Sequence, residues 1–190
     1  PFYTVALELP GLTVSGERMS DRASAEQLKE ACQGAAVTIK KVECKEKSEK
    51  PPALYDLTTL QRDANRLLGF TAQQTLDYLQ SLYEKKLCTY PRTDSRYLTG
   101  DMADSLPVLV NLVANAMPFR KGIAITCDPQ TVINDKKVTD HHAVIPTRNL
   151  KDADLSALPA GEKAVLELVA LRLLCAVAQP HIYSETVVIA

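Results

Sequence analysis

The chain lacks tryptophan, has three phenylalanines in 190 residues, and contains no apolar run long enough to span a membrane. Aliphatic side chains must therefore form most of its core. Hydrophobic residues make up 46% of the sequence, which is enough for a packed core and excludes a largely disordered chain. The five cysteines include no CxxC pair, which argues against a zinc site or a disulfide framework and favours a reducing compartment.

An excess of positive charge is also missing. The 22 lysines and arginines are balanced by 23 acidic residues, giving a formal net charge of -1. Many nucleic-acid-binding domains are strongly basic, so any DNA-binding surface here must be a local patch. A glycine-rich phosphate loop, HExxH and GxSxG are absent as well. Asp152-Ala153-Asp154 has the spacing of a metal-binding pair, but its composition indicates a surface loop, and we predict no metal ligands in this chain.

The first third of the chain reads as strands around one short helix. Alternating apolar residues predict a strand over 2–9, and Ser24–Gln27 resembles a capping box that opens a helix ending near Gly34. A second strand is predicted over Ala36–Val42. Residues 40–50 mix both charges, as on a solvated strand edge that leads into a linker. Pro51-Pro52 marks a predicted domain boundary.

Helices dominate the middle of the chain. Thr58 or Thr59 can cap a helix that Gly69 stops, and Thr71–Gln74 is a capping box for the next helix. Two helices joined by so short a turn resemble a helix-turn-helix unit, although many such pairs are purely structural. Further helices are predicted over 101–116, interrupted near Pro107, and over 161–178, before a final strand over 184–190.

The most distinctive segment pairs a tyrosine with an arginine two residues later. Pro91 favours an extended conformation at Tyr90, and residues i and i+2 of an extended segment point to the same side. Tyr90 and Arg92 should therefore place a phenol beside a fixed positive charge. That combination suits attack on a phosphodiester, although a half-buried strand tyrosine beside a surface arginine gives the same pattern.

A second candidate site contains two of the three histidines. His141 and His142 are adjacent, so in a strand they point to opposite faces and cannot easily share one metal ion. A single histidine could donate a hydrogen bond to a phosphate oxygen or carry a proton. On spacing alone, a histidine satisfied by a backbone hydrogen bond is the more common case.

Three ordered stretches resemble those of type IA DNA topoisomerases, and most closely their topoisomerase III branch. They are residues 50–65, residues 80–98 and residues 141–147. The resemblance implies that Tyr90 attacks a single-stranded DNA phosphate and becomes linked to its 5′ side. The other strand then passes through the opening before the 3′-hydroxyl reseals it. Rejoining would need no ATP, because the phosphotyrosine ester conserves the energy of the broken bond.

The same resemblance assigns roles to other residues. Arg92 matches the arginine that holds the scissile phosphate, and His141 matches a histidine expected near a DNA phosphate. His142 stands where related enzymes often carry glutamate. The remaining matched positions should line the site or bind the DNA strand; they are Asp94, Ser95, Thr59 and Gln61.

Family architecture implies an α+β fold. Residues 51–182 would form the mostly helical domain that bears the tyrosine, and residues 1–50 with 183–190 would be part of the β-rich arch, their strands forming one sheet. Family enzymes also carry a Toprim domain with an acidic Mg²⁺ cluster, which nothing in this chain matches. We therefore expect no cofactor in this chain, Mg²⁺ in the full-length enzyme, and no cleavage by this chain alone.

Partners and location follow from the same resemblance. Single-stranded DNA and the rest of the same polypeptide are the expected partners, with no membrane. The expected location is the cytoplasm of a bacterium, or the nucleus if the source is eukaryotic. Two other functions stay open for the chain by itself: a stand-alone module that binds duplex DNA through its helix pair, and a protein-interaction scaffold.

Overall fold

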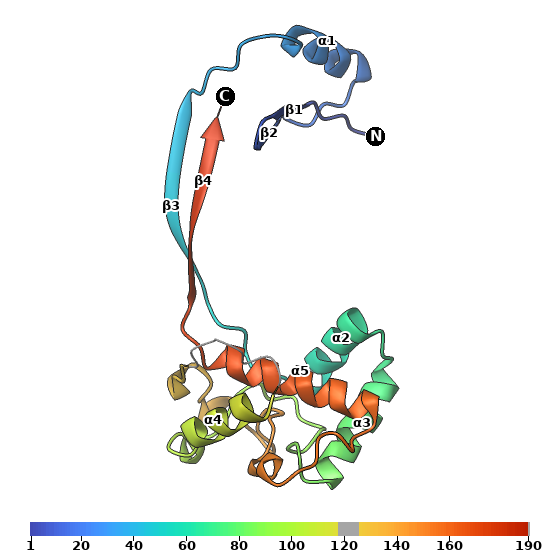
Figure 1. Ribbon diagram of the computed structural model, residues 1–190, viewed down its shortest axis with the longest axis vertical. Coiled ribbons are helices and arrows are strands. Elements are labelled where there is room, and N and C mark those ends of the chain that lie inside the picture. The colour runs from blue at the N-terminus through green and yellow to red at the C-terminus, as the bar shows by residue number, and fades with distance from the viewer. Residues whose placement is uncertain (118–125, 190) are drawn as a thin grey trace. The chain divides into compact units, whose positions relative to one another are not determined.

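The computed structural model describes residues 1–117 and 126–189, and its contacts divide the chain into two units (Figure 1). One unit contains Pro1–Lys47 with Ile182–Ala190, and the other contains Ser48–His181. The division predicted from sequence differs little, with junctions at 50/51 and 182/183. Each unit is described by itself below.

The N-terminal unit begins with a hairpin of β1 (Ala6–Leu9) and β2 (Leu12–Ser15), which pair antiparallel around Gly11. Gly11 has φ 77°, a left-handed conformation that glycine adopts without steric cost. Helix α1 (Arg22–Cys32) follows. Its cap is Asp21, whose carboxylate accepts hydrogen bonds from the backbone of Ala23 and Ser24. The predicted capping box at Ser24 is therefore wrong by one helical turn.

A second two-stranded sheet pairs β3 (Lys41–Glu49) with β4 (His181–Ile189). A cross-strand ion pair joins Lys47 to Glu185 at 2.6 Å. Within the described residues the strands thus form two separate sheets, and the expectation of one sheet is wrong. The strand predicted over 36–42 begins only at Lys41. Its pairing with β4 continues through the charged residues that follow, as far as Glu49.

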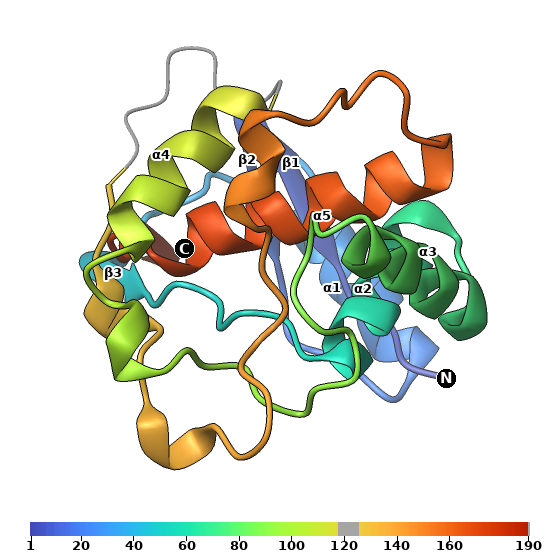
Figure 2. The same cartoon turned by 90° about the horizontal axis from the view of Figure 1, so that it is seen from below.

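The second unit packs its helices around α5 (Ala160–Ala176). Helices α2 (Leu57–Leu68) and α3 (Ala72–Glu84) contact α5, as does α4 (Leu106–Ala116) (Figure 2). Aliphatic side chains fill the core, as the scarcity of aromatic residues requires. The largest fully buried ones include Leu60, Leu79, Leu82, Leu106, Leu166 and Leu173. The α+β class predicted from sequence is confirmed.

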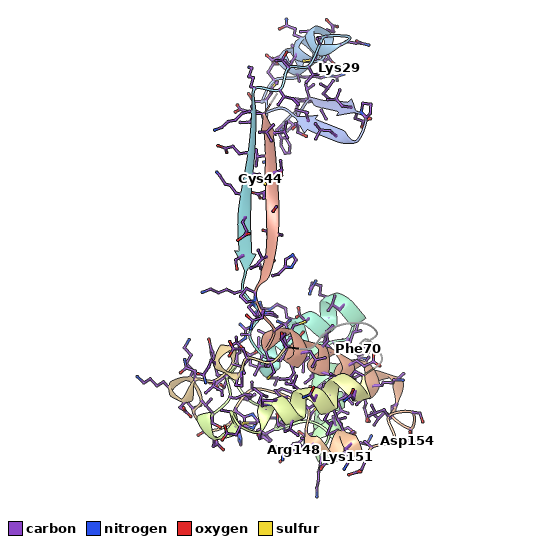
Figure 3. The ribbon with its side chains drawn as sticks, turned by 60° about the vertical axis from the view of Figure 1, so that its left-hand side comes forward. Lys29, Cys44, Phe70, Arg148, Lys151 and Asp154 are labelled. Carbon is purple, nitrogen blue, oxygen red and sulfur yellow. The ribbon has the colours of Figure 1, made fainter. Side chains whose placement is uncertain are left out.

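The α2–α3 pair is fixed at both helix starts. Asp56 caps α2 by accepting from the Thr59 backbone at 2.6 Å, so the predicted threonine cap lies two or three residues too late. Thr71 caps α3 through the predicted box with Gln74. Phe70, in the turn between the helices, packs edge-on against Tyr78 with ring centroids 5.2 Å apart (Figure 3). This ring contact helps to stabilise the turn between α2 and α3.

Pro107 lies in the first turn of α4, where its missing N–H leaves no helical hydrogen bond unmade. A separate 3₁₀ turn, Gly100–Met102, precedes the helix. The predicted interruption near Pro107 is thus the start of the helix. Across the described ranges, none of the helices is both long and apolar enough to cross a membrane.

Candidate active site

Two extended segments run side by side and carry the predicted site residues. Residues 87–98 contact residues 141–147 through backbone hydrogen bonds spaced along both segments. They are Thr147 N to Leu87 O at 2.9 Å, Thr89 N to Ile145 O at 2.9 Å and Ala143 N to Tyr97 O at 2.9 Å. Pairing of these segments brings Tyr90 and His141 together, although 51 positions separate them in the sequence (141 − 90).

The Tyr90 ring lies between two other rings. The His141 imidazole is tilted against it by 39°, with centroids 4.3 Å apart. The Tyr83 ring from α3 meets it edge-on, at 82° and 5.4 Å. Edge-on aromatic pairs of this kind are favourable beyond the area that they bury. The phenol is therefore held in place from two sides while Tyr90 stays partly exposed.

Arg92 is exposed, and its guanidinium donates a hydrogen bond to the side-chain oxygen of Gln80 at 2.9 Å. Gln80 and Tyr83 are three residues apart on α3, so they are neighbours on one helix face. Tyr90 contacts one of them and Arg92 the other. Both candidate catalytic side chains thus lie along the same face of α3.

Hydroxyl groups on the extended segment fix its backbone. The Thr93 hydroxyl donates to the carbonyl of His141 at 2.8 Å. Ser95 is 4% exposed, and its hydroxyl donates to the Lys137 carbonyl at 2.9 Å. Asp94, between them, is exposed. In this arrangement Ser95 stabilises the loop from inside, while Asp94 faces solvent, where a DNA strand could reach it.

Thr59 and Gln61, both predicted to bind DNA, make contacts within the helix pair. The Thr59 hydroxyl accepts from the backbone of Asp56 at 3.2 Å as part of the α2 cap. The Gln61 amide donates to the carbonyl of Ala72 at 3.0 Å and so joins α2 to α3. Contacts of these residues with DNA stay predictions.

A polar network anchors this region to the core. The Tyr55 hydroxyl donates to Asp63 at 2.8 Å and accepts from Arg172 at 2.9 Å, while the Arg172 guanidinium stacks on the Tyr55 ring and pairs with Asp63. Burial, and then the bond to Asp63, raise the pKa of Tyr55 to about 12. Burial alone would raise the pKa of Asp63, but its hydrogen bonds from Tyr55 and Arg66 and the nearby arginine charges hold it below its usual value.

The network reaches the site through the backbone. Tyr55 forms a bridge with Val144, whose N–H donates to the Tyr55 carbonyl at 2.8 Å. Arg96 adds a second link by donating to the Leu54 carbonyl at 3.1 Å. Helices α2 and α5 thereby position the segment that carries His141.

Helix α3 is fixed to α5 by a largely buried carboxylate. Glu162 is 6% exposed, accepts from the Ser81 hydroxyl at 2.9 Å and forms an ion pair with Lys85. These contacts hold the C-terminal half of α3, where Gln80 and Tyr83 also lie.

Close to the site, burial raises the pKa of the Cys88 thiol to about 12, so this thiol stays neutral at physiological pH.

Exposed lysines and arginines lie next to the end of the joined segments where Leu87 pairs with Thr147. Lys85 and Lys86 follow α3, and Arg148 and Lys151 lie on the 3₁₀ turn after residue 147 (Figure 3). Lys86 has φ 60°, and its carbonyl accepts from the Asn149 side chain at 3.1 Å, which fixes this corner.

In the part of the chain that the structure describes, no group of three or more His, Cys, Asp or Glu side chains could hold a metal ion.

Sequence reasoning assigned no role to Gln80 or Tyr83, although both lie inside a stretch that carries the family resemblance. Their i, i+3 spacing on a predicted helix placed them on one face. Nothing in the sequence showed that this face would meet the Tyr90 segment, because that contact depends on how α3 packs.

Comparison with known proteins shows the family to which this chain belongs. The family model described as DNA topoisomerase matches residues 1–190, and the chain belongs to this family, in its type IA class. It is 40% identical over 189 residues to DNA topoisomerase 3 of Shouchella clausii, covering 92% of this chain and 26% of that protein. It is 35% identical over 206 residues to DNA topoisomerase 3 of Bacillus subtilis, covering 100% of this chain and 28% of that protein.

A solved structure shares the fold. Full-length topoisomerase I from Thermotoga maritima superposes with a TM-score of 0.69 at 24% identity, covering 96% of this chain and 30% of that one. The chain thus spans between a quarter and a third of each of these three proteins.

Proposed function

We propose that this chain is the nucleophile-bearing segment of a longer type IA topoisomerase that cleaves and rejoins single-stranded DNA. The observation that carries the proposal is the position of Tyr90, which is partly exposed and packed between His141 and Tyr83, on the helix face whose Gln80 holds the Arg92 guanidinium. A purely structural tyrosine would not need an imidazole against its ring and an arginine on the same helix face at a solvent-accessible surface.

The cleavage step is a transesterification. The Tyr90 phenolic oxygen bonds to phosphorus and the bond from phosphorus to the 3′ oxygen breaks, while the phenolic proton leaves and the 3′ oxygen gains one. Arg92 binds the non-bridging oxygens as negative charge builds on them, and His141 donates a hydrogen bond to the phosphate. One ester replaces another, so the reverse attack by the 3′-hydroxyl reseals the strand without ATP.

The rest of the enzyme would complete the site. We propose that Mg²⁺ enters through a Toprim domain elsewhere in the polypeptide, and that the unit of Pro1–Lys47 with Ile182–Ala190 is part of the arch that carries the tyrosine domain. The 190-residue chain alone should then not cleave DNA. The relatives named above are bacterial, and we place the enzyme in the bacterial cytoplasm with its DNA.

The direct test traps the covalent intermediate of the full-length enzyme with denaturant, using single-stranded DNA labelled at either end. We expect the label to stay with the protein when it lies on the 3′ side of the cut, and the modified peptide to contain Tyr90. An adduct on another residue, or on the opposite DNA end, would overturn the assignment. Binding of duplex DNA with no adduct would instead favour a non-covalent module built on α2 and α3.

A further inference from the structure

The Gln80 side chain connects Arg92 to an acidic residue without letting the two meet. Its amide oxygen accepts from the Arg92 guanidinium at 2.9 Å, and its amide nitrogen donates to the Glu84 carboxylate at 2.9 Å. A guanidinium can only donate and a carboxylate can only accept. One orientation of the amide therefore satisfies both partners, and they fix it between them.

Gln80 thereby gives Arg92 a neutral partner. Glu84 lies one turn further along the same helix face and is exposed, so it is the carboxylate placed to pair with Arg92 if Gln80 were absent. Hydrogen bonds between two charged groups are roughly twice as strong as those with a neutral partner. An arginine held by an amide is easier for a phosphate to capture than one held by a carboxylate.

We propose that Gln80 is a positioning residue of the cleavage site: it holds the Arg92 guanidinium on the face of α3 that Tyr90 also contacts, and keeps it from Glu84 until a DNA phosphate displaces the amide. The inference rests on the proposed function, because it assumes that Arg92 binds the scissile phosphate. Gln80 itself acts through Arg92 and needs no contact with the reacting atoms.

The first test measures covalent complex formation by the full-length enzyme against the concentration of single-stranded DNA. In Gln80→Glu, Arg92 is held by a carboxylate that the phosphate must displace. We expect the half-saturating DNA concentration to rise about three- to five-fold, while the plateau of covalent complex stays unchanged. A half-saturating concentration equal to that of wild type would overturn the proposal.

Gln73 supplies the matched control. It lies on the same helix and donates to the carboxylate four residues ahead, Asp77, at 2.7 Å. Gln73→Glu therefore makes the same charge change next to the same kind of neighbour, about two helical turns along α3 from Gln80. We expect wild-type DNA dependence. A rise equal to that of Gln80→Glu would assign the effect to general charge and count against the proposal.

A rescue experiment separates positioning from packing. Methionine has the length and helix propensity of glutamine but no amide, so Gln80→Met should let Glu84 pair with Arg92 and raise the half-saturating concentration. Adding Glu84→Gln removes that carboxylate and should restore the wild-type value. A defect that persists in the double variant would show that Gln80 acts only in folding, and would overturn the proposal.

Different results would contradict the proposed function and the proposed role of Gln80. If the wild-type enzyme forms no adduct, or Tyr90→Phe forms one, the proposed function is wrong. If the wild type cleaves and the Gln80 variants match it, only the role of Gln80 is wrong. Thermal melting of each variant shows whether it is folded. If Gln80→Glu unfolds, Gln80→Met still tests the proposal.

Discussion

The His141 imidazole rests against the Tyr90 ring, with ring centroids 4.3 Å apart. The two residues come from different extended segments, and the backbone pairing between those segments sets this contact. Removing the imidazole therefore changes both the packing of Tyr90 and the polar groups available to a phosphate. The two contributions can be separated by experiment.

His141→Phe keeps a ring against Tyr90 but removes its hydrogen-bonding nitrogens. We expect covalent complex formation by the full-length enzyme to fall about 100-fold, as when one donor to a developing oxyanion is lost. The neighbouring His142, whose Nδ1 lies 2.8 Å from the carbonyl of Ala143, provides the control. His142→Phe should stay within a few-fold of wild type. Equal losses in the two variants would contradict the assignment of His141.

Tyr83 supports the nucleophile through its ring. Truncation in Tyr83→Ala removes the edge-on contact and should slow single-turnover cleavage about three- to ten-fold, since such contacts contribute about 0.5–1.5 kcal/mol. Tyr83→Phe retains the ring and should cleave at the wild-type rate. If Tyr83→Phe is as slow as Tyr83→Ala, the hydroxyl and not the ring would be the important group.

Tyr55 links the core network to the segment that carries His141, so replacing Tyr55 should lower the free energy of unfolding. Tyr55→Phe removes two hydrogen bonds and should lower the free energy of unfolding of the 190-residue chain by about 1–3 kcal/mol at pH 7. Chemical denaturation followed by circular dichroism measures this directly. An unchanged free energy of unfolding would show that the network is not stabilising.

The same variant tests the pKa of Tyr55. The folded state holds this phenolic proton more tightly than the unfolded state, because its pKa is raised from 10.0 to about 12. The resulting stabilisation is complete below pH 10 and is lost as the pH rises toward 12. The difference in stability between wild type and Tyr55→Phe should therefore shrink over that interval. A constant difference would contradict the raised pKa.

Local signals in the sequence predicted the helices, the N-cap of α3 and the C-cap of α2, because Thr71–Gln74 and Gly69 act on their own neighbours. The other caps were misplaced, since Asp21 and Asp56 compete with nearby serine and threonine for the same role. The separation of the strands into two sheets depends on pairing between distant segments. No local pattern specifies such pairing.

The candidate site likewise combines residues that a local pattern predicts with residues that only packing brings to it. Tyr90 and Arg92 could be predicted as a pair because two-residue spacing in an extended segment is a local property. Gln80 and Tyr83 were missed because their contacts depend on how α3 packs against that segment. The hydrogen bond from Ser81 of α3 to Glu162 of α5 helps to fix this packing. The role of Ser95 in lining the site or binding the DNA strand stays a prediction, and the sequence did not indicate that its hydroxyl donates to the backbone of Lys137.

The central claim is that the Tyr90 phenol is the nucleophile, and replacing that one oxygen tests it most directly. The full-length enzyme should form a denaturant-stable adduct with single-stranded DNA, and Tyr90→Phe should form none while still binding the strand. Tyr97→Phe, a change in the same extended segment, should leave the adduct intact. An undiminished adduct in Tyr90→Phe would contradict the account.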